Sequence, residues 1–304
     1  MRILITGGAG YIGTALVESL VLHESVESIL VYDNLRRGNR NLFIGGQHGQ
    51  HDKVEFIHGD LLDSRKLKKT LQDIDVVYHL AANVTTPFSD QNPHLFEQIN
   101  NWGTAELVYA IEESSVKKVV YLSSVSVYGT SSTPLTAESN LNPRTFYGIS
   151  KMRGEEHLKS LERKVETYII RCGNVYGYNK SMRFDAVINR FMFEANFHNR
   201  ITINGTGEQC RPFIHISKVT NALVQLIFGG TEKGVYNLVD QNWAIGEVVK
   251  TLREVYPTLE MLFVNQHMKM RELKVHGSEE LKELYNEESS LLEELEQFKK
   301  HFTF

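Results

Sequence analysis

Cysteine is scarce in this sequence, with two residues in 304, which excludes a fold held together by several disulfides. Cys172 and Cys210 do not form the close pairs of a metal-ligand motif, so we expect no metal site and two reduced thiols in a cytoplasmic protein. Long apolar runs are also missing, since none approaches the ~20 residues that a membrane span requires. Glycines interrupt the N-terminal stretch where a signal peptide needs a continuous apolar core.

The sequence also lacks an excess of basic charge, because 33 Lys and Arg stand against 37 Asp and Glu and are scattered among them. This balance predicts that neither nucleic acid nor a membrane surface is a partner. Repeats and low-complexity segments are absent. The chain is long enough to bury a full core, and we expect one large domain with a smaller lobe.

The chain begins with an apolar strand, a glycine pattern and an apolar helix. Residues 2–6 predict a buried strand, and Gly7, Gly10 and Gly13 follow it with the spacing GxxGxxG. Such glycines permit a tight turn, close approach of the backbone to a pyrophosphate, and close packing of the helix on the strand. A second apolar strand ends about 20 residues later at Asp33, whose carboxylate can accept hydrogen bonds from a ribose hydroxyl. The stretch predicts a dinucleotide site that prefers NAD to NADP.

Strands and helices alternate through the first half of the chain, which predicts a parallel sheet with helices on both faces. The expected strands there are 2–6, 28–32, 54–58, 76–80, 118–122 and 167–171, and the expected helices are 11–22, 64–71, 93–113 and 146–162. Ligands of such sheets bind at the carboxyl ends of the strands.

Beyond Tyr178 the alternation loosens, which indicates a substrate lobe. The expected helices there are 185–197, 218–228, 245–256 and a charged region over 278–302 broken near Ser289, and the expected strands are 200–204, 212–216, 235–239 and 260–264. We therefore expect an α/β fold with a Rossmann-type doubly wound parallel sheet over residues 1–175, to which 212–240 returns. A smaller mixed C-terminal substrate lobe is expected over 176–304.

Tyr147 and Lys151 open the predicted helix 146–162 in the sequence YGISK, and their i,i+4 spacing places them on one face about 6 Å apart. A tyrosine needs its pKa lowered by about three units to act as a base at neutral pH, which costs ~4 kcal/mol. One cation at about 4 Å supplies roughly that much at an effective dielectric of ~20. We expect Lys151, with a positive nicotinamide ring, to lower the pKa of Tyr147. Taken alone, YxxxK is more often a solvated helix pair, and its place after the fifth strand favours catalysis.

Ser124 ends that fifth strand in the sequence YLSSVSVYG, where its hydroxyl can contact both a substrate oxygen and Tyr147. Serines at strand ends also satisfy loop backbone groups. Ser123 and Ser126 are weaker candidates, because alternation along the strand directs Ser123 to the other face.

Together, GGAGYIG, Asp33, LAAN, the serine strand and YGISK resemble the extended short-chain dehydrogenase/reductase family, especially its nucleotide-sugar epimerases and dehydratases. The resemblance extends over roughly residues 1–228. It implies NAD as the cofactor and a catalytic triad of Ser124, Tyr147 and Lys151. The residues implied to line the NAD site are Gly7, Gly10, Tyr11, Ile12, Gly13, Asp33, Asn34, Asp60, Leu61, Ala81, Ala82 and Asn100, with Tyr147 and Lys151.

The resemblance also implies a sugar-nucleotide site. In GTGEQCRPFIHI, Arg211 stands where the family's arginine holds the diphosphate, and a bidentate guanidinium suits that anion. Asn174 resembles the family's substrate-contacting asparagine. Arg183 and Asn189 lie where the following helix can reach the nucleotide, although a solvated surface role for Arg183 is equally open. Pro212 departs from the family's acidic residue, and the C-terminal third gives no match that selects the sugar.

The family's 4,6-dehydratases carry an Asp and a Glu directly after the hydroxyl residue of the triad, where this chain has Val125 and Ser126. Neither side chain is an acid. We therefore expect an NAD-dependent epimerase of a nucleotide-diphosphate sugar, acting at C4 through a 4-keto intermediate. A reductase, dehydrogenase or dehydratase of the same family is the alternative. A non-catalytic dinucleotide sensor is a remote alternative, because a sensor needs no activated tyrosine.

The helices 93–113 and 146–162 predict a homodimer, as in many relatives. Leu95, Ile99, Trp102 and Leu107 add more apolar surface than one face of a sheet needs. The apolar stripe of the last helical region is interpreted as docking on the lobe, with a dimer contact as the alternative.

Overall fold

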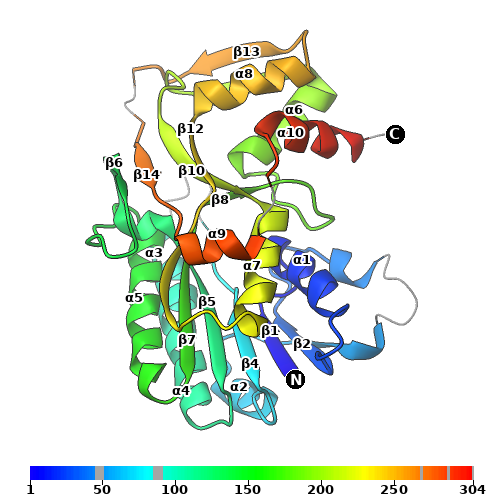
Figure 1. Cartoon of the computed structure of the whole chain (residues 1–304), viewed down its shortest axis with the longest axis vertical. Coiled ribbons are helices and arrows are strands. Elements are labelled where there is room, and N and C mark those ends of the chain that lie inside the picture. The colour runs from blue at the N-terminus through cyan, green and yellow to red at the C-terminus, as the bar shows by residue number, and fades with distance from the viewer. Residues whose placement is uncertain (45–50, 85–91, 268–269, 286–287, 303–304) are drawn as a thin grey trace.

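The computed structural model describes residues 1–44, 51–84, 92–267, 270–285 and 288–302. A seven-stranded sheet, in which every neighbouring pair is parallel, occupies the lower part of Figure 1. In spatial order its strands are β11 (Gly234–Leu238), β7 (Glu166–Cys172), β5 (Lys118–Ser124), β4 (Val76–His79), β1 (Arg2–Thr6), β2 (Ser28–Asp33) and β3 (Val54–His58). The direction of winding reverses between β1 and β4, so their carboxyl ends form the crevice where ligands of such sheets bind.

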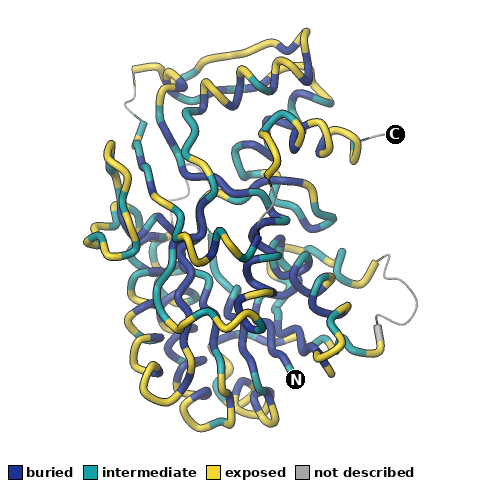
Figure 2. Tube along the Cα trace, viewed as in Figure 1, coloured by how far each residue is buried: buried dark blue, intermediate teal, exposed yellow. Residues whose placement is uncertain are grey.

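The side chains of each strand alternate between two cores, one on each face of the sheet. Ile3 and Ile5 of β1 pack in the first core and Leu4 packs in the second, and none of the three has exposed surface. Figure 2 shows this interior in dark blue. The first face is covered by α1 (Tyr11–Leu20), α7 (Ile216–Phe228) and α9 (Glu279–Tyr285), and the second by α2 (Ser64–Thr70), α4 (Gly103–Glu112) and α5 (Phe146–Ser160).

A smaller group of elements lies above the sheet in Figure 1. Its mixed three-stranded sheet has β10 (Cys210–His215) between antiparallel β12 (Gln241–Ala244) and parallel β8 (Asn174–Tyr176). Parallel strands β9 (Arg200–Asn204) and β13 (Glu260–Val264) form a second small sheet. The helices α6 (Val187–His198), α8 (Ile245–Val255) and α10 (Leu291–Lys300) enclose a third core with these strands.

The remaining elements are short. Strands β6 (Ser131–Leu135) and β14 (Leu273–Val275) pair in parallel. A π-helix, η3 (Glu97–Trp102), joins α3 (Pro93–Phe96) to α4. The 3₁₀-helices are η1 (Asn41–Phe43), η2 (His51–Lys53), η4 (Val125–Tyr128) and η5 (Leu161–Arg163). In the described part of the chain, no helix is both long enough and apolar enough to cross a bilayer.

The expected architecture, a Rossmann-type parallel sheet with a smaller mixed part, is confirmed. Within the stretch 212–240, α7 and β11 lie on the large sheet, whereas β10 belongs to the small one. The domain boundary at residue 175 stays a prediction. The expected helix 93–113 is helical over 93–112, and the π-helix between α3 and α4 was not expected.

The last helical region forms two helices on different cores, and residues 286–287 between them lie outside the described part. Leu281 of α9 packs on the large sheet and not on the lobe, whereas Leu295 and Phe298 of α10 pack in the third core. Ser290 caps α10, where its hydroxyl accepts from the Glu293 amide at 3.3 Å.

Candidate active site

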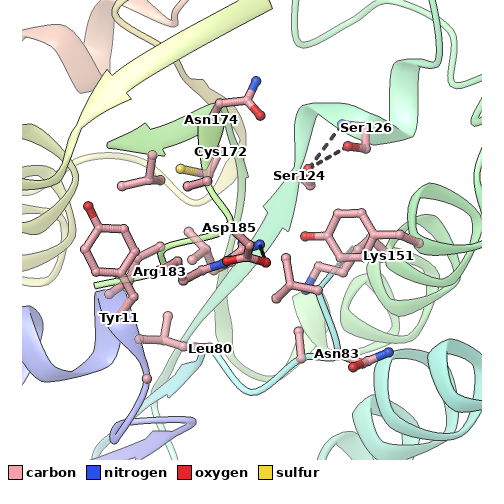
Figure 3. A pocket seen from close by; sticks show the side chains of 18 of the residues that line it. Tyr11, Leu80, Asn83, Ser124, Ser126, Lys151, Cys172, Asn174, Arg183 and Asp185 are labelled. Atoms are coloured by element: carbon pink, nitrogen blue, oxygen red, sulfur yellow. Dashed lines mark hydrogen bonds and ion pairs between the residues drawn. The ribbon is translucent and has the colours of Figure 1, made fainter. Parts of the chain in front are cut away.

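A cavity of about 940 Å³ lies at the carboxyl ends of the large sheet and reaches the small three-stranded sheet. This volume is at the upper end of the range for ligand pockets, as a dinucleotide with a second ligand requires. Figure 3 shows side chains from both parts of the molecule around it. Of the residues that the sequence predicted, those lining the cavity are Gly7, Gly10, Tyr11, Ile12, Gly13, Asp33, Asn34, Asp60, Leu61, Ala81, Ala82, Ser124, Tyr147, Lys151, Asn174, Arg183 and Arg211.

The glycine turn brings backbone close to backbone at two points. Gly7 has φ +73°, and a Cβ there would lie 2.5 Å from the Ala81 nitrogen. A Cβ on Gly13 would lie 2.4 Å from the carbonyl oxygen of Gly7, so the start of α1 packs directly on the turn. No side chain caps α1, whose first residue follows Gly10. The turn therefore presents backbone N–H groups at a helix N-terminus, which suits a pyrophosphate.

Asp33 joins the end of β2 to the glycine turn. Its Oδ2 accepts from the Ala9 amide at 3.1 Å and its Oδ1 accepts from the Leu35 amide at 2.8 Å. Burial raises the pKa of Asp33, and the two amides and His58 oppose that effect.

Asp60 extends the same wall beyond β3. Its Oδ2 accepts from Asn34 Nδ2 at 2.9 Å, and its Oδ1 accepts from the Leu62 amide at 3.0 Å. Backbone and amide groups thus orient both carboxylates on this side of the cavity.

Ser124, Tyr147 and Lys151 meet because η4 packs on the start of α5. A Cβ on Gly148 would lie 2.6 Å from the carbonyl oxygen of Ser126, so this contact excludes a larger residue. Thr145 caps α5 by accepting from the Gly148 amide at 3.0 Å, which starts the helix just before Tyr147.

Ser124 Oγ donates to Ser126 Oγ at 3.1 Å and accepts from the Ser126 amide at 3.2 Å, as Figure 3 shows. Ser124, Tyr147 and Lys151, the candidate triad, all line this cavity.

In the protein alone, burial opposes the expected lowering of the pKa of Tyr147. Burial raises the pKa of Tyr147, against the opposing effects of a hydrogen bond with Ser124 and the charges of Arg183 and Arg37. Burial also lowers the pKa of Lys151 to about 7, which Glu155 opposes. The expectation did not include the desolvation of both side chains. It concerned an enzyme with a positive nicotinamide ring beside Tyr147, and for that state the lowered pKa stays a prediction.

Arg183 is part of the cavity wall, and its side chain is 22% exposed. It forms an ion pair with Asp185 at 2.8 Å, and Figure 3 shows both between Tyr11 and Lys151. Although burial acts to raise it, the pKa of Asp185 is lowered because Arg183 and Arg37 favour the charged carboxylate. The sequence reasoning missed Asp185. No local sequence signal identified Asp185, because its place in the cavity wall follows from the tertiary structure.

Two predicted residues lie behind the cavity wall. Asn100, on the π-helix, is 1% exposed; its Oδ1 accepts from the Asn83 amide at 2.7 Å and its Nδ2 donates to the Asn83 carbonyl at 2.9 Å. Asn189 has no exposed surface; its Oδ1 accepts from the Gly177 amide at 3.0 Å and its Nδ2 donates to the Arg183 carbonyl at 3.1 Å. Both amides hold neighbouring backbone groups in place, and neither side chain lines the cavity.

Two arginines line the cavity where it reaches the small three-stranded sheet. Arg211 of β10 is joined there by Arg271, which the sequence reasoning missed. Burial lowers the pKa of Arg211, and the charge of Arg271 lowers it further. Asn174 donates from Nδ2 to the Pro212 carbonyl at 2.9 Å, which holds the neighbouring strands together. Two neighbouring guanidinium groups make this end suitable for a diphosphate.

Residues 3–238 match the model of the NAD dependent epimerase/dehydratase family. The chain belongs to this family. Membership confirms the resemblance drawn from the motifs and makes the chain an enzyme of a family that uses NAD.

Relatives within the family differ in reaction. The chain is 33% identical over 226 residues to a putative UDP-glucose 4-epimerase of Methanocaldococcus jannaschii, covering 72% of this chain and 71% of that protein. It is 32% identical over 244 residues to the dTDP-D-glucose 4,6-dehydratase of Bos taurus, covering 78% and 67%. The UDP-glucuronic acid 4-epimerase of Bacillus cereus, solved with UDP-glucuronic acid and NAD, superposes with a TM-score of 0.85 at 26% identity, covering 99% and 98%. These relatives do not decide between epimerisation and dehydration, so the reaction is inferred from the residues of the cavity.

Proposed function

We propose that the protein is an NAD-dependent epimerase that inverts C4 of a nucleotide-diphosphate sugar through a 4-keto intermediate. The observation that carries this proposal is a triad without an acid for dehydration. Val125 and Ser126 follow Ser124, and the Ser126 hydroxyl is bonded to Ser124. A dehydratase needs an acid to protonate the leaving hydroxyl.

The carboxylates among the described residues that line the cavity do not supply that acid. They are Asp33, Asp60 and Asp185. Asp33 and Asp60 accept backbone amides at the ends of β2 and β3, away from β5. Asp185 is paired with Arg183, and its lowered pKa keeps it ionised at neutral pH. An ionised, paired carboxylate is a poor proton donor.

The residues present fit NAD. The glycine turn and the N-terminus of α1 would hold its pyrophosphate, Asp33 and Asp60 would bind the adenosine side, and Lys151 would hold the nicotinamide ribose. NAD, when bound, supplies a group that accepts a hydride and returns it. Asp33 lies where its charge disfavours the additional phosphate of NADP.

Residues of the chain itself would carry out the proton transfer and hold the substrate. Tyr147 takes the proton of the sugar 4-OH, and Ser124 donates a hydrogen bond to the same oxygen. Because burial raises the pKa of Tyr147, the base depends on the hydrogen bond with Ser124 and on the positive charges of Arg183 and Arg37, which lower that pKa. Arg211 and Arg271 hold the diphosphate while the 4-keto sugar turns, so that the hydride can return to its other face.

We also propose that the protein is a homodimer through α4 and α5. Trp102, Tyr109 and Phe146 are 55%, 53% and 44% exposed on or beside these helices. Two residues expected at this surface lie elsewhere, since Leu107 is 1% exposed in the second core and Ile99 lines the cavity. The proposed dimer surface therefore depends on the exposed aromatic side chains of Trp102, Tyr109 and Phe146.

The decisive experiment is incubation with UDP-, dTDP-, GDP- and CDP-sugars, with and without added NAD⁺, followed by chromatographic separation of isomers. The expected product has the mass of its substrate, and dinucleotide is not consumed. A product lighter by one water would identify a dehydratase, and stoichiometric reduction of the added NAD⁺ would identify a dehydrogenase. Either result would contradict the epimerase proposal.

A further inference from the structure

A buried ion pair between Glu155 of α5 and Arg171 of β7 lies behind the candidate catalytic residues. Their side chains are 1% and 4% exposed. Arg171 Nε donates to Oε1 and Oε2 of Glu155 at 3.0 and 3.2 Å, and Nη2 donates to Oε2 at 2.8 Å. Ser123 Oγ donates to Oε1 at 2.5 Å. The carboxylate therefore has donors from two neighbouring strands.

The other side of Arg171 is also satisfied. Its Nη1 donates to the Tyr128 hydroxyl at 2.9 Å and to the Ala137 carbonyl at 2.8 Å. Tyr128 in turn donates to Asn237 Oδ1 at 2.7 Å. The network thus connects α5, β5, β7, η4 and β11. A buried polar network whose members all have partners holds its elements in one arrangement.

This network is attached directly to the proposed triad. Glu155 follows Lys151 by one helical turn, and Ser123 is next to Ser124 in the chain. The strands β5 and β7 are in register at this point, with Ser123 opposite Arg171. Any change in how α5 packs on β5 would therefore move Lys151 relative to Ser124.

Among the groups around Lys151, Glu155 supplies the negative charge that favours the protonated lysine. Lys151 Nζ lies 4.2 Å from the ring centroid of Tyr121 on β5, and Tyr147 shares its helix. His79 of β4 is neutral at physiological pH, because burial and Lys151 lower its pKa to about 3. Glu155 is the group whose charge favours the protonated lysine against burial.

We propose that Glu155, clamped by Arg171 and Ser123, is a positioning residue that keeps Lys151 charged and sets the spacing of Ser124, Tyr147 and Lys151. The inference rests on the proposed catalytic role of these three residues. The alternative is that the ion pair only stabilises the fold. The two differ in pH behaviour, because a purely structural pair has no effect on the charge of Lys151 in a folded variant.

The test uses a variant that removes the network without leaving a buried charge or hydroxyl unpaired: Ser123→Ala, Glu155→Met and Arg171→Met together. Apolar replacement of a whole buried ion pair is often tolerated. The first measurement is the Kd for NAD from about pH 6 to 10, which reports the charge of Lys151 and requires no sugar. In the variant, the pH at which NAD binding weakens is expected to fall by about one unit.

The second measurement is turnover on the sugar that the wild-type enzyme converts. The variant's kcat is expected to fall about 10²-fold with KM changed less than threefold, because misplaced catalytic groups lower the rate more than binding. Glu155→Asp is expected to return the NAD profile toward wild type while kcat stays low. Since NAD binding is measured separately, a wrong assignment of the epimerised sugar would leave the first result intact.

Two further variants keep the test decisive. Glu155→Gln is the second network variant. It removes the negative charge, keeps an acceptor for Ser123 and leaves Arg171 charged, so the pH at which NAD binding weakens is expected to fall by about one unit or more. Glu294→Gln is the matched control, since Glu294 is also buried and pairs with Lys218, away from the triad. An NAD profile that overlays the wild type in both network variants would overturn the proposal.

Discussion

Arg183 and Asp185 form a two-point ion pair in the wall of the cavity, in which Nε donates to Oδ1 at 3.0 Å and Nη2 donates to Oδ2 at 2.8 Å. Arg183 is one of the two arginines whose charge acts to lower the pKa of Tyr147. Asp185 partly balances that charge. The pair therefore determines how strongly the arginines support the candidate base.

Asp185→Asn is expected to lower the pKa of Tyr147, because it removes the negative charge beside Arg183 and Arg37. A base with a lower pKa is deprotonated at lower pH, so the acidic limb of the kcat profile should move to lower pH, by about half a unit. The profile is measured alongside Glu260→Gln, which breaks an exposed ion pair with Arg200. A limb that moves to higher pH would contradict this account.

The second prediction concerns the choice of dinucleotide. The Kd for NAD is expected to be at least tenfold lower than the Kd for NADP, because the charge of Asp33 repels an additional phosphate. Asp33→Asn should bring the two Kd values closer together. It should also weaken the binding of both dinucleotides, since Asp33 accepts hydrogen bonds from the Ala9 and Leu35 amides. Titration with each dinucleotide tests both statements, and tighter binding of NADP to the wild type would refute the assignment.

The third prediction concerns acid stability. Burial and Lys151 lower the pKa of His79 to about 3, against about 6.5 in an unfolded chain. Between these values the unfolded chain binds a proton that the folded protein does not, so stability falls as the pH falls from about 6.5 to 3. The full difference is on the order of 4–5 kcal/mol.

His79→Gln should therefore lose less of its unfolding free energy between pH 7 and 4 than the wild type, as measured by urea unfolding. His276→Gln, at an exposed position, is the control. Parallel pH dependence in the wild type and His79→Gln would contradict the prediction.

The strands could be predicted, and a candidate triad could be proposed, because their signals are local. A continuous apolar run identifies a strand such as β1, and the spacing of Tyr147 and Lys151 identifies a helix face. The pairing of β6 with β14 joins residues 131–135 to 273–275. Strand β6 is mostly polar and β14 has three residues, so neither contains an apolar run like that of β1. The roles of Asn100 and Asn189 depend on a π-helix and on a turn at Gly177, which composition does not reveal.

The pKa of Tyr147 could not be predicted from spacing either. The i,i+4 argument counted the charge of Lys151 but not the water that both side chains lose when the fold buries them. That loss depends on helices and strands from the whole chain. Asp185 illustrates the same limit, because its pairing with Arg183 and its place in the wall follow from tertiary structure.

The fourth prediction concerns assembly. The wild type is expected to sediment as a dimer at micromolar concentration, and Trp102→Glu is expected to shift it to a monomer, because a charge at the centre of an apolar contact is costly to bury. Leu262→Glu is the control, since Leu262 is 49% exposed on β13, away from α4 and α5. A monomeric wild type, or a Trp102→Glu dimer as tight as the wild type, would contradict the proposed interface.

The last prediction combines the base with the fate of hydrogen at C4. Tyr147→Phe is expected to lower kcat by about 10²- to 10⁴-fold with NAD binding nearly unchanged, since it removes one acid–base group from the pocket. Ser124→Ala should cost less, and Tyr236→Phe on β11 is the control. In the wild type, a substrate deuterated at C4 should keep its label at C4 of the product, because the hydrogen never exchanges with water on its way to the other face of the sugar. Loss of the label to solvent, or its appearance at C6, would refute inversion through a 4-keto sugar while leaving the role of Tyr147 as the base intact.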